Sequence, residues 1–149
     1  MHSAKRERSL KMNIRDSLNL SRSARDEIAR DLIALGGLPF YFLVLVRSTI
    51  GGYLSFFSHV VIALPVLFLI SRAVKGSNLH IARGFILVIF TSIFYKALPF
   101  TIFSILVWCV MIYSLVYLKT GTREILKGIA LGVVSVIISY SITLLIIPG

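Results

Sequence analysis

The sequence is poor in the residues that metal and redox chemistry require. Cys109 is its one cysteine, so these 149 residues hold no disulfide and no pair of thiolate ligands. Acidic residues are also scarce, with six Asp and Glu against 16 Lys and Arg, and Glu124 is the only one after Leu32. A mechanism based on two carboxylates and a carboxylate metal site are therefore not expected, and neither a metal nor a cofactor is predicted.

Common catalytic motifs are absent as well. The sequence contains no Gly-rich phosphate loop, no His-Glu-x-x-His pair and no nucleophile elbow. Each of these motifs supplies a defined chemical group at a fixed spacing, and none of them can be assembled here. The patterns typical of soluble enzymes therefore give no support for an enzyme.

Apolar residues, by contrast, are abundant. They make up 57% of the chain, the mean hydropathy is +0.91, and from Leu32 onward they form nearly continuous runs. Runs of this length and composition are typical of helices that cross a membrane. The sequence predicts an all-α integral membrane protein, with a basic arm and an interfacial amphipathic helix in residues 1–31 and a bundle of about five transmembrane helices in residues 32–149.

The Lys and Arg residues between the apolar runs alternate in density. Eight of the 16 precede Leu32, and the four connections that follow hold one, three, one and three. Because short basic loops stay in the cytoplasm, this pattern predicts a multi-pass protein of the cell membrane with a cytoplasmic N-terminus. A tight turn from Lys96 to Pro99 is expected, since an unpaired lysine inside one long span would cost at least about 2.5 kcal/mol. The predicted spans are residues 32–50, 53–71, 80–95, 98–118 and 128–147.

The basic N-terminal arm contains a stretch of helical periodicity. Apolar residues recur near helical spacing among the charges of residues 17–31, and Ser23 with Asp26 resembles a capping box. We predict an amphipathic helix that lies on anionic lipid head groups, preceded by an irregular tail over residues 1–11. Nucleic acid is not predicted as a partner, because no aromatic or glycine pattern accompanies the charge.

The last predicted span carries small residues at steps of three and four. These residues are Gly128, Gly132, Ser135, Ser139 and Thr143. Such a stripe lets a neighbouring helix approach closely. The first hypothesis is that the stripe packs against another helix of the same chain, and the second is a homo-oligomer through Gly128, Gly132, Ser135 and Ser139.

Polar and basic residues gather near the two loops predicted to be cytoplasmic. The candidate ligands of a phosphate group are Lys75, Asn78, Arg83, Ser114, Arg123 and Glu124. Cations with hydroxyl and amide donors at helix ends suit a phosphate, and Arg83 and Arg123 are predicted to approach one another with His80 between them. The alternative is that these cations only mark the cytoplasmic side and extend to the interface.

Two histidines are candidates for function. His80 lies at the start of the third predicted span, where an imidazole can exchange protons with water, and is the candidate general acid. His59 lies in the middle of the second span, where an ionisable residue is a functional hypothesis by default. The alternative for His59 is a neutral imidazole that bonds to a neighbouring helix.

The stretch around His80 resembles a motif of a known family. Residues 77–85, Ser-Asn-Leu-His-Ile-Ala-Arg-Gly-Phe, look like the second motif of the type-2 phosphatidic acid phosphatases, the lipid phosphate phosphatase superfamily, in which Pro-Ser-Gly-His opens a transmembrane helix. Residues 114–118, Ser-Leu-Val-Tyr-Leu, resemble the start of that family's third motif. The resemblance covers about half of the chain, residues 77–147, and implies a similar bundle with a lipid-facing cytoplasmic pocket.

Most of the family's catalytic residues have no counterpart in this sequence. The resemblance places His80 where the family has the acid that protonates the leaving alcohol, and Ser114 where the third motif begins. Leu115 stands in place of a phosphate-clamping arginine, Thr120 or Gly121 in place of the nucleophilic histidine, and Glu124 near the family's aspartate. The family's first motif is missing. The chain is thus identified as a degenerate member of the superfamily.

Three functions are compatible with these observations. The first is a protein without phosphatase activity that binds a phospholipid or polyprenyl phosphate head group, or a membrane partner, at the cytoplasmic face. The second is an active lipid phosphate phosphatase with a rearranged site. The third is a small transporter or channel subunit in which His59 and Lys96 line a path. The first is favoured, because the chain has one interfacial histidine where phosphohistidine chemistry needs two.

Overall fold

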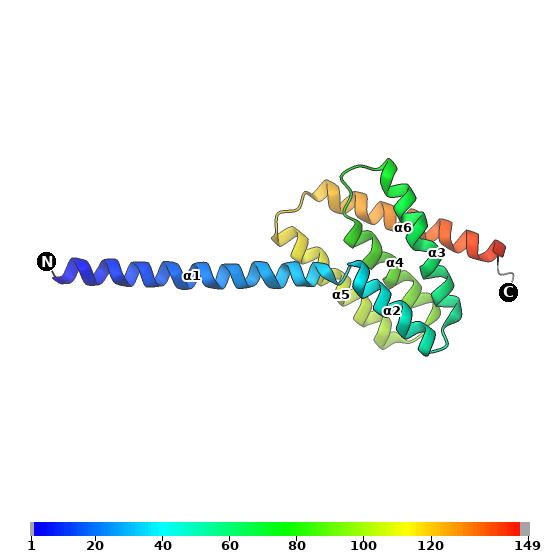
Figure 1. Ribbon diagram of the computed structural model, residues 1–149, viewed down its shortest axis with the longest axis horizontal. Helices are drawn as coiled ribbons and strands as arrows, with labels where there is room; N and C mark the ends of the chain where they lie inside the picture. Colours follow the sequence, from blue (N-terminus) through cyan, green and yellow to red (C-terminus); the bar gives the residue numbers. More distant parts are fainter. Residues whose placement is uncertain (1, 147–149) are drawn as a thin grey trace.

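The computed structural model describes residues 2–146, and within that range it consists of helices and short connections without a strand. Figure 1 shows α1 as a long helix that extends away from a bundle formed by the other five helices. The part of α1 nearest the bundle contacts α5. The helices are α1 (His2–Ala34), α2 (Leu38–Ile50), α3 (Leu54–Ala73), α4 (Leu79–Phe94), α5 (Leu98–Tyr117) and α6 (Thr122–Ile146).

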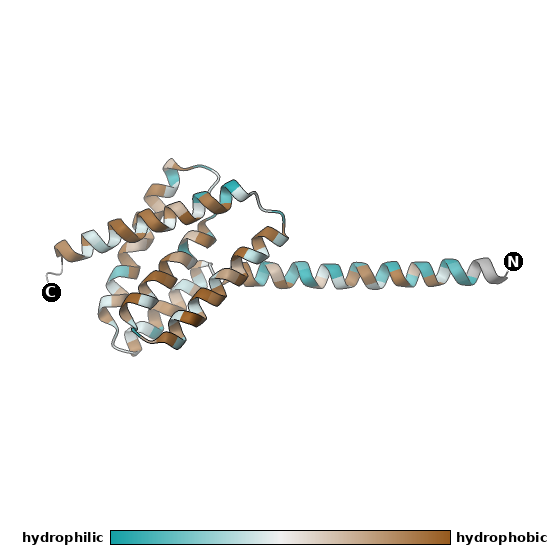
Figure 2. Ribbon diagram, turned by 180° about the vertical axis from the view of Figure 1, so that it is seen from behind, coloured by the Kyte–Doolittle hydropathy of each residue, from teal (hydrophilic) through white to brown (hydrophobic). Residues whose placement is uncertain are grey.

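The prediction of an all-helical membrane protein is confirmed. Helices α3, α5 and α6 are long and apolar enough to cross a membrane, and α1 with α2 forms a fourth candidate that is bent by 45°. The apolar helix α4 has 16 residues, so it is about 24 Å long against a hydrocarbon layer of roughly 30 Å. Helix length therefore gives three or four candidate spans, against the five that the charge pattern predicts. Figure 2 shows hydrophobic residues spread over the bundle, with hydrophilic residues concentrated in α1.

A break at residues 35–37 divides the first predicted span into two helices. Helix α1 ends at Ala34, and α2 begins at Leu38 with a proline in its first turn. Gly36 lies so close to the backbone of His80 that a Cβ atom there would collide with the His80 carbonyl group. The close approach of α4 thus requires a glycine where the chain changes direction. The predicted domain boundary after residue 31 falls inside α1, shortly before this break.

The N-terminal arm is more regular than the sequence suggests. We expect an irregular tail over residues 1–11, but α1 is helical from His2 onward, and Met1 lies outside the described residues. Leu10, Ile14 and Leu18 are exposed and recur every four residues, which places them on one side of the helix. The arm therefore presents an apolar stripe that extends beyond the predicted helix toward the N-terminus.

Helix α4 lies at the centre of the bundle, where it packs against α3, α5 and α6. Small residues of α6 allow the close approach, because a Cβ atom at Gly128 would lie 2.5 Å from the carbonyl oxygen of Asn78 and one at Gly132 would lie 3.0 Å from the ring of Phe85. All five residues of the small-residue stripe are buried within the chain. The stripe is therefore an internal packing surface, as the first of the two hypotheses predicts.

The connections of the bundle lie at two ends. The α1 end contains residues 35–37, 74–78 and 118–121, and the backbone N–H of Asn78 donates to the carbonyl oxygen of Glu124 there at 3.2 Å. The opposite end contains residues 51–53 and 95–97, where the rings of Tyr53 and Tyr95 stack with centroids 4.2 Å apart. Helices α2 to α6 therefore run in alternating directions. The predicted turn at Lys96 is confirmed, because this exposed residue connects α4 to α5 with a φ of 48°.

Candidate functional site

The predicted ligands separate into two groups at the α1 end. His80 and Arg83 lie on the side of α4 that faces α1 and α2. Asn78 and Glu124 lie where the first turns of α4 and α6 meet, with Lys75 and Arg123 exposed nearby in the loop and on α6. Ser114 belongs to neither group, because it is buried in α5.

Asn78 is used mainly to begin α4. Its side-chain oxygen accepts from the backbone N–H groups of His80, at 3.1 Å, and Ile81, at 3.3 Å. This is an N-cap, which satisfies two backbone donors that have no partner within the helix. The cap fixes the first turn of α4 and with it the position of His80.

Two of the predicted ligands, Lys75 and Ser114, form contacts that stabilise the fold. The Nζ atom of Lys127 donates to the carbonyl oxygen of Lys75 at 3.1 Å, which joins α6 to the loop between α3 and α4. The hydroxyl of Ser114 donates to the carbonyl oxygen of Val110 at 2.8 Å within α5. Ser114 is 2% exposed, so a ligand would reach it only after the helices separate.

The structure does not bring Arg123 to Arg83. The face of α4 that contacts α6 contains Asn78, Ile81 and Phe85, since Gly128 and Gly132 of α6 lie against these residues. On a helix of 3.6 residues per turn, Arg83 lies on the face of α4 opposite to this one, which is directed toward α2. Arg123 is exposed on the first turn of α6. The two arginines therefore belong to different surfaces of the same end.

His80 and Arg83 form a polar pair in an apolar setting. The Nη2 atom of Arg83 lies 3.4 Å from Nδ1 of His80. A guanidinium group has only donors, so Nδ1 accepts, and the imidazole of this pair is neutral with its proton on Nε2. The Nε atom of Arg83 is buried and has no hydrogen-bond partner among the described residues. The guanidinium group therefore retains capacity to bind an acceptor.

This pair lines a cavity of about 700 Å³ at the junction of α1, α2 and α4. The remaining lining is apolar apart from Asp31, an exposed carboxylate at the end of α1. A half-buried guanidinium beside an apolar wall suits an amphiphile with an anionic head, because a charged hydrogen bond is strengthened where water is excluded. Asp31 opposes such an anion, so its charge is part of the site.

His80 is the only histidine in the lining of this cavity. His80 has no histidine beside it, since His59 lies inside the bundle and His2 lies at the start of α1. The backbone N–H of Thr120 donates to the carbonyl oxygen of Leu115, which holds the turn between α5 and α6. No group of three His, Cys, Asp or Glu residues lies together in the part of the chain that the structure describes.

His59 occupies an aromatic environment between α3, α4 and α6. Its Nδ1 atom lies 2.6 Å from the carbonyl oxygen of Ser55, and its ring is 4.5 Å from that of Phe94 and 5.4 Å from that of Tyr140. A carbonyl only accepts, so Nδ1 carries the proton and the buried Nε2 atom has no partner among the described residues. The contacts fit a packed neutral imidazole.

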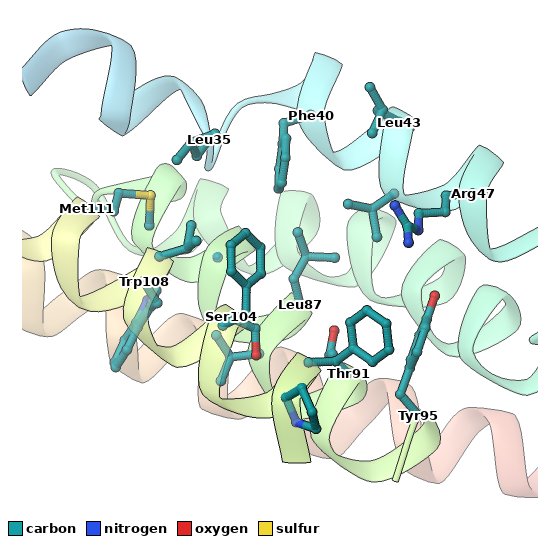
Figure 3. Close-up of a pocket in the computed structure, with 17 residues that line it drawn as sticks. Leu35, Phe40, Leu43, Arg47, Leu87, Thr91, Tyr95, Ser104, Trp108 and Met111 are labelled. Atoms are coloured by element: carbon teal, nitrogen blue, oxygen red, sulfur yellow. The ribbon is translucent and has the colours of Figure 1, made fainter. Parts of the chain in front are cut away.

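A second cavity, which the sequence did not predict, opens between α2, α4 and α5. It has a volume of about 490 Å³ and an almost wholly apolar lining, as Figure 3 shows. Its polar residues are Arg47, Thr91, Tyr95 and Ser104. It shares Leu35, Phe40 and Leu43 with the cavity of His80 and Arg83, so the two are neighbours along α2. In the sequence, the features that could have indicated this cavity are Gly84 and the isolated cation Arg47.

Fold and site together define an all-helical membrane protein with two neighbouring cavities, each containing an arginine. Comparisons with known protein families, with curated proteins and with solved structures find no match. The resemblance to the lipid phosphate phosphatases therefore stays a prediction.

Proposed function

We propose that this protein binds the anionic head group of a phospholipid or polyprenyl phosphate at the α1 end of the bundle. The observation that carries the proposal is the half-buried guanidinium of Arg83, whose Nε atom has no hydrogen-bond partner among the described residues, in a cavity that is otherwise apolar apart from His80 and Asp31. Phosphate oxygens bind guanidinium groups through short charged hydrogen bonds. The apolar residues around the pair then contact the lipid chain.

The proposal includes a five-span topology in the cell membrane, with the α1 end in the cytoplasm. The alternating directions of α2 to α6 support it, as does the excess of Lys and Arg at the α1 end. The short helix α4 is compatible with it, because protein encloses α4 on several sides and its ends need not meet lipid. The exposed apolar stripe of α1 lies on the membrane surface in this topology.

A degenerate relationship to the lipid phosphate phosphatases is part of the same proposal. His80 and Arg83 come from the stretch that resembles the family's second motif, and they lie together at the start of α4. The missing nucleophilic histidine favours binding over hydrolysis. Retention of a head-group site after loss of the catalytic groups explains both observations.

The proposal is tested by lipid retention. Protein in phosphatidylcholine nanodiscs with a minor component of phosphatidic acid is released into the gas phase, and bound phosphatidic acid is counted by native mass spectrometry. Replacement Arg83→Gln removes a charged hydrogen bond of about 1.5–3 kcal/mol, so the apparent affinity is expected to fall at least tenfold. Arg72→Gln is the matched control, because Arg72 is exposed at the end of α3 and lies over the ring of Phe68. Equal losses of affinity in both variants would mean that Arg83 contributes only as one of several surface charges, and would contradict the proposal.

A further inference from the structure

The groove between α2, α4 and α5 has a cation at one mouth and an otherwise mostly apolar lining, in which Thr91 and Ser104 supply the hydroxyl groups beyond Tyr95. Arg47, from the last turn of α2, lies at the opposite end of the bundle together with Tyr95. Figure 3 shows the Arg47 guanidinium directed toward the groove and the Tyr95 hydroxyl pointing toward α2. Toward the α1 end, the lining continues with Trp108 and Met111. The groove is thus amphipathic along its axis.

Aromatic residues pack around Tyr95 at this mouth and fix the position of its ring. Tyr95 stacks on Tyr53 with ring centroids 4.2 Å apart and packs edge-on against Phe56 at 5.2 Å. The ring of Phe100 also lies near it, with centroids 5.6 Å apart. Tyrosine at such a position is typical of the membrane interface, where an apolar ring and a polar tip face different media. The mouth therefore lies at the depth of lipid head groups.

A second copy of this chain offers no acidic side chain as a counter-ion for Arg47. Outside α1 the sequence has one acidic residue, Glu124, and it lies at the α1 end. In a copy with the same orientation in the membrane, Glu124 lies at the same end, far from Arg47. A lipid phosphate lies at the required depth and has the required charge.

The length of the groove matches one lipid leaflet. At 1.5 Å per residue along α4, the distance from Tyr95 to Gly84, which lies beside Trp108, is about 16 Å. Half of a hydrocarbon layer of roughly 30 Å is about 15 Å. A chain whose phosphate lies at Arg47 therefore ends close to Trp108.

We propose that this groove binds one acyl chain of an anionic phospholipid whose phosphate pairs with Arg47, in the leaflet away from the α1 end. The site differs from that of Arg83 in its cation, its leaflet and its chain path. It does not depend on head-group binding at the α1 end.

The test uses Trp108, the one tryptophan of the sequence, as a reporter within the groove. Its Nε1 atom donates to the carbonyl oxygen of Ile81 at 3.3 Å, which holds the indole in place. The protein is placed in phosphatidylcholine nanodiscs that contain either brominated phosphatidylglycerol or brominated phosphatidylcholine, and quenching of the fluorescence is compared at equal mole fractions. Bromine atoms are placed either near the chain end or near the carbonyl group.

We expect brominated phosphatidylglycerol to associate roughly fivefold more tightly than brominated phosphatidylcholine, with stronger quenching from bromine near the chain end. Arg47→Gln should remove this preference, Arg47→Lys should restore most of it, and Arg83→Gln should leave it unchanged. Equal quenching by both lipids in the native chain would overturn the proposal. So would a preference lost in Arg83→Gln alone, which would mean that the chain enters from the α1 end. Absence of quenching would mean that protein closes the groove, and would overturn it as well.

Discussion

The two ends of the bundle both combine an arginine with an apolar wall, but they differ in the charge around that arginine. At the α1 end, Arg83 is half-buried, contacts His80 and shares its cavity with the carboxylate of Asp31. At the opposite end, Arg47 is exposed and no acidic residue lies near it. A carboxylate of the protein thus lies in the cavity of Arg83, whereas in our proposal the counter-ion of Arg47 is a lipid phosphate.

The burial of each arginine determines how strongly it depends on a ligand. A guanidinium that loses water needs acceptors in compensation, and the Nε atom of Arg83 has none among the described residues. Arg47 keeps access to water, so an unoccupied state costs it little. We infer that a ligand at Arg83 stabilises the fold itself, while a lipid at Arg47 exchanges with its leaflet under weak selection.

The strongest test of the comparison is whether the two ends face different compartments. Cys109 is exposed on α5, so it is first replaced by Ser, and single cysteines are introduced at Lys75 and Lys96. A membrane-impermeant maleimide applied to intact cells should label position 96 and leave position 75 unlabelled until the cells are opened. This outcome is all or none, because a bilayer separates the two positions in the proposed topology.

The same experiment can refute the arrangement of spans. A cysteine at Arg123 should behave like the one at position 75, since both residues lie at the α1 end. Labelling of positions 96 and 123 from the same side would contradict the five-span topology, and the comparison would then concern two sites in one leaflet.

A second prediction concerns the carboxylate that distinguishes the α1 end. Replacement Asp31→Asn removes a negative charge from the cavity of Arg83, so retention of phosphatidic acid should rise roughly fivefold, corresponding to about 1 kcal/mol for one charge near the surface. Native mass spectrometry of the nanodisc samples measures the change. Glu27→Gln, an exposed carboxylate on the same helix, is the control. Weaker retention in Asp31→Asn would mean that Asp31 positions Arg83 instead of opposing the ligand.

Patterns along single helices allowed most of the fold to be predicted from sequence. The turn at Lys96 followed from the cost of burying an unpaired charge, and the internal stripe of α6 followed from small residues at helical spacing. The break at residues 35–37 falls inside the first predicted span, and the contact that accompanies it is with His80, which is distant in sequence. Contacts between distant segments leave no periodic signal.

The site was harder to predict for a related reason. Charge and residue type identified His80 and Arg83, but the expected approach of Arg123 depended on which face of α4 meets α6. Helical periodicity separates Arg83 from Ile81 and Phe85, although it does not say which of these faces meets α6. The groove beside Arg47 arises because α2 and α5 leave space between them, which no single segment encodes.

The smallest expected effect is in catalysis, where we predict none. A phosphohistidine route needs one group that attacks phosphorus and another that protonates the leaving oxygen, and the α1 end has His80 alone. In the pair with Arg83, Nδ1 of His80 accepts a hydrogen bond and is not free to attack. Thr120 and Thr122 are weak nucleophiles without an adjacent base, and Glu124 lies on the face of the bundle where α4 and α6 meet.

Release of inorganic phosphate from phosphatidic acid or a polyprenyl diphosphate should therefore not exceed that of a His80→Ala variant, measured with purified protein in nanodiscs. The comparison of the two ends supplies a further control, because Arg47→Gln leaves the α1 end intact and should give the same background. Reproducible turnover that His80→Ala abolishes and Arg47→Gln preserves would instead mean that the α1 end is an active phosphatase. Glu124 would then be the first candidate for activation of water or of a threonine, and Glu124→Gln would test that role.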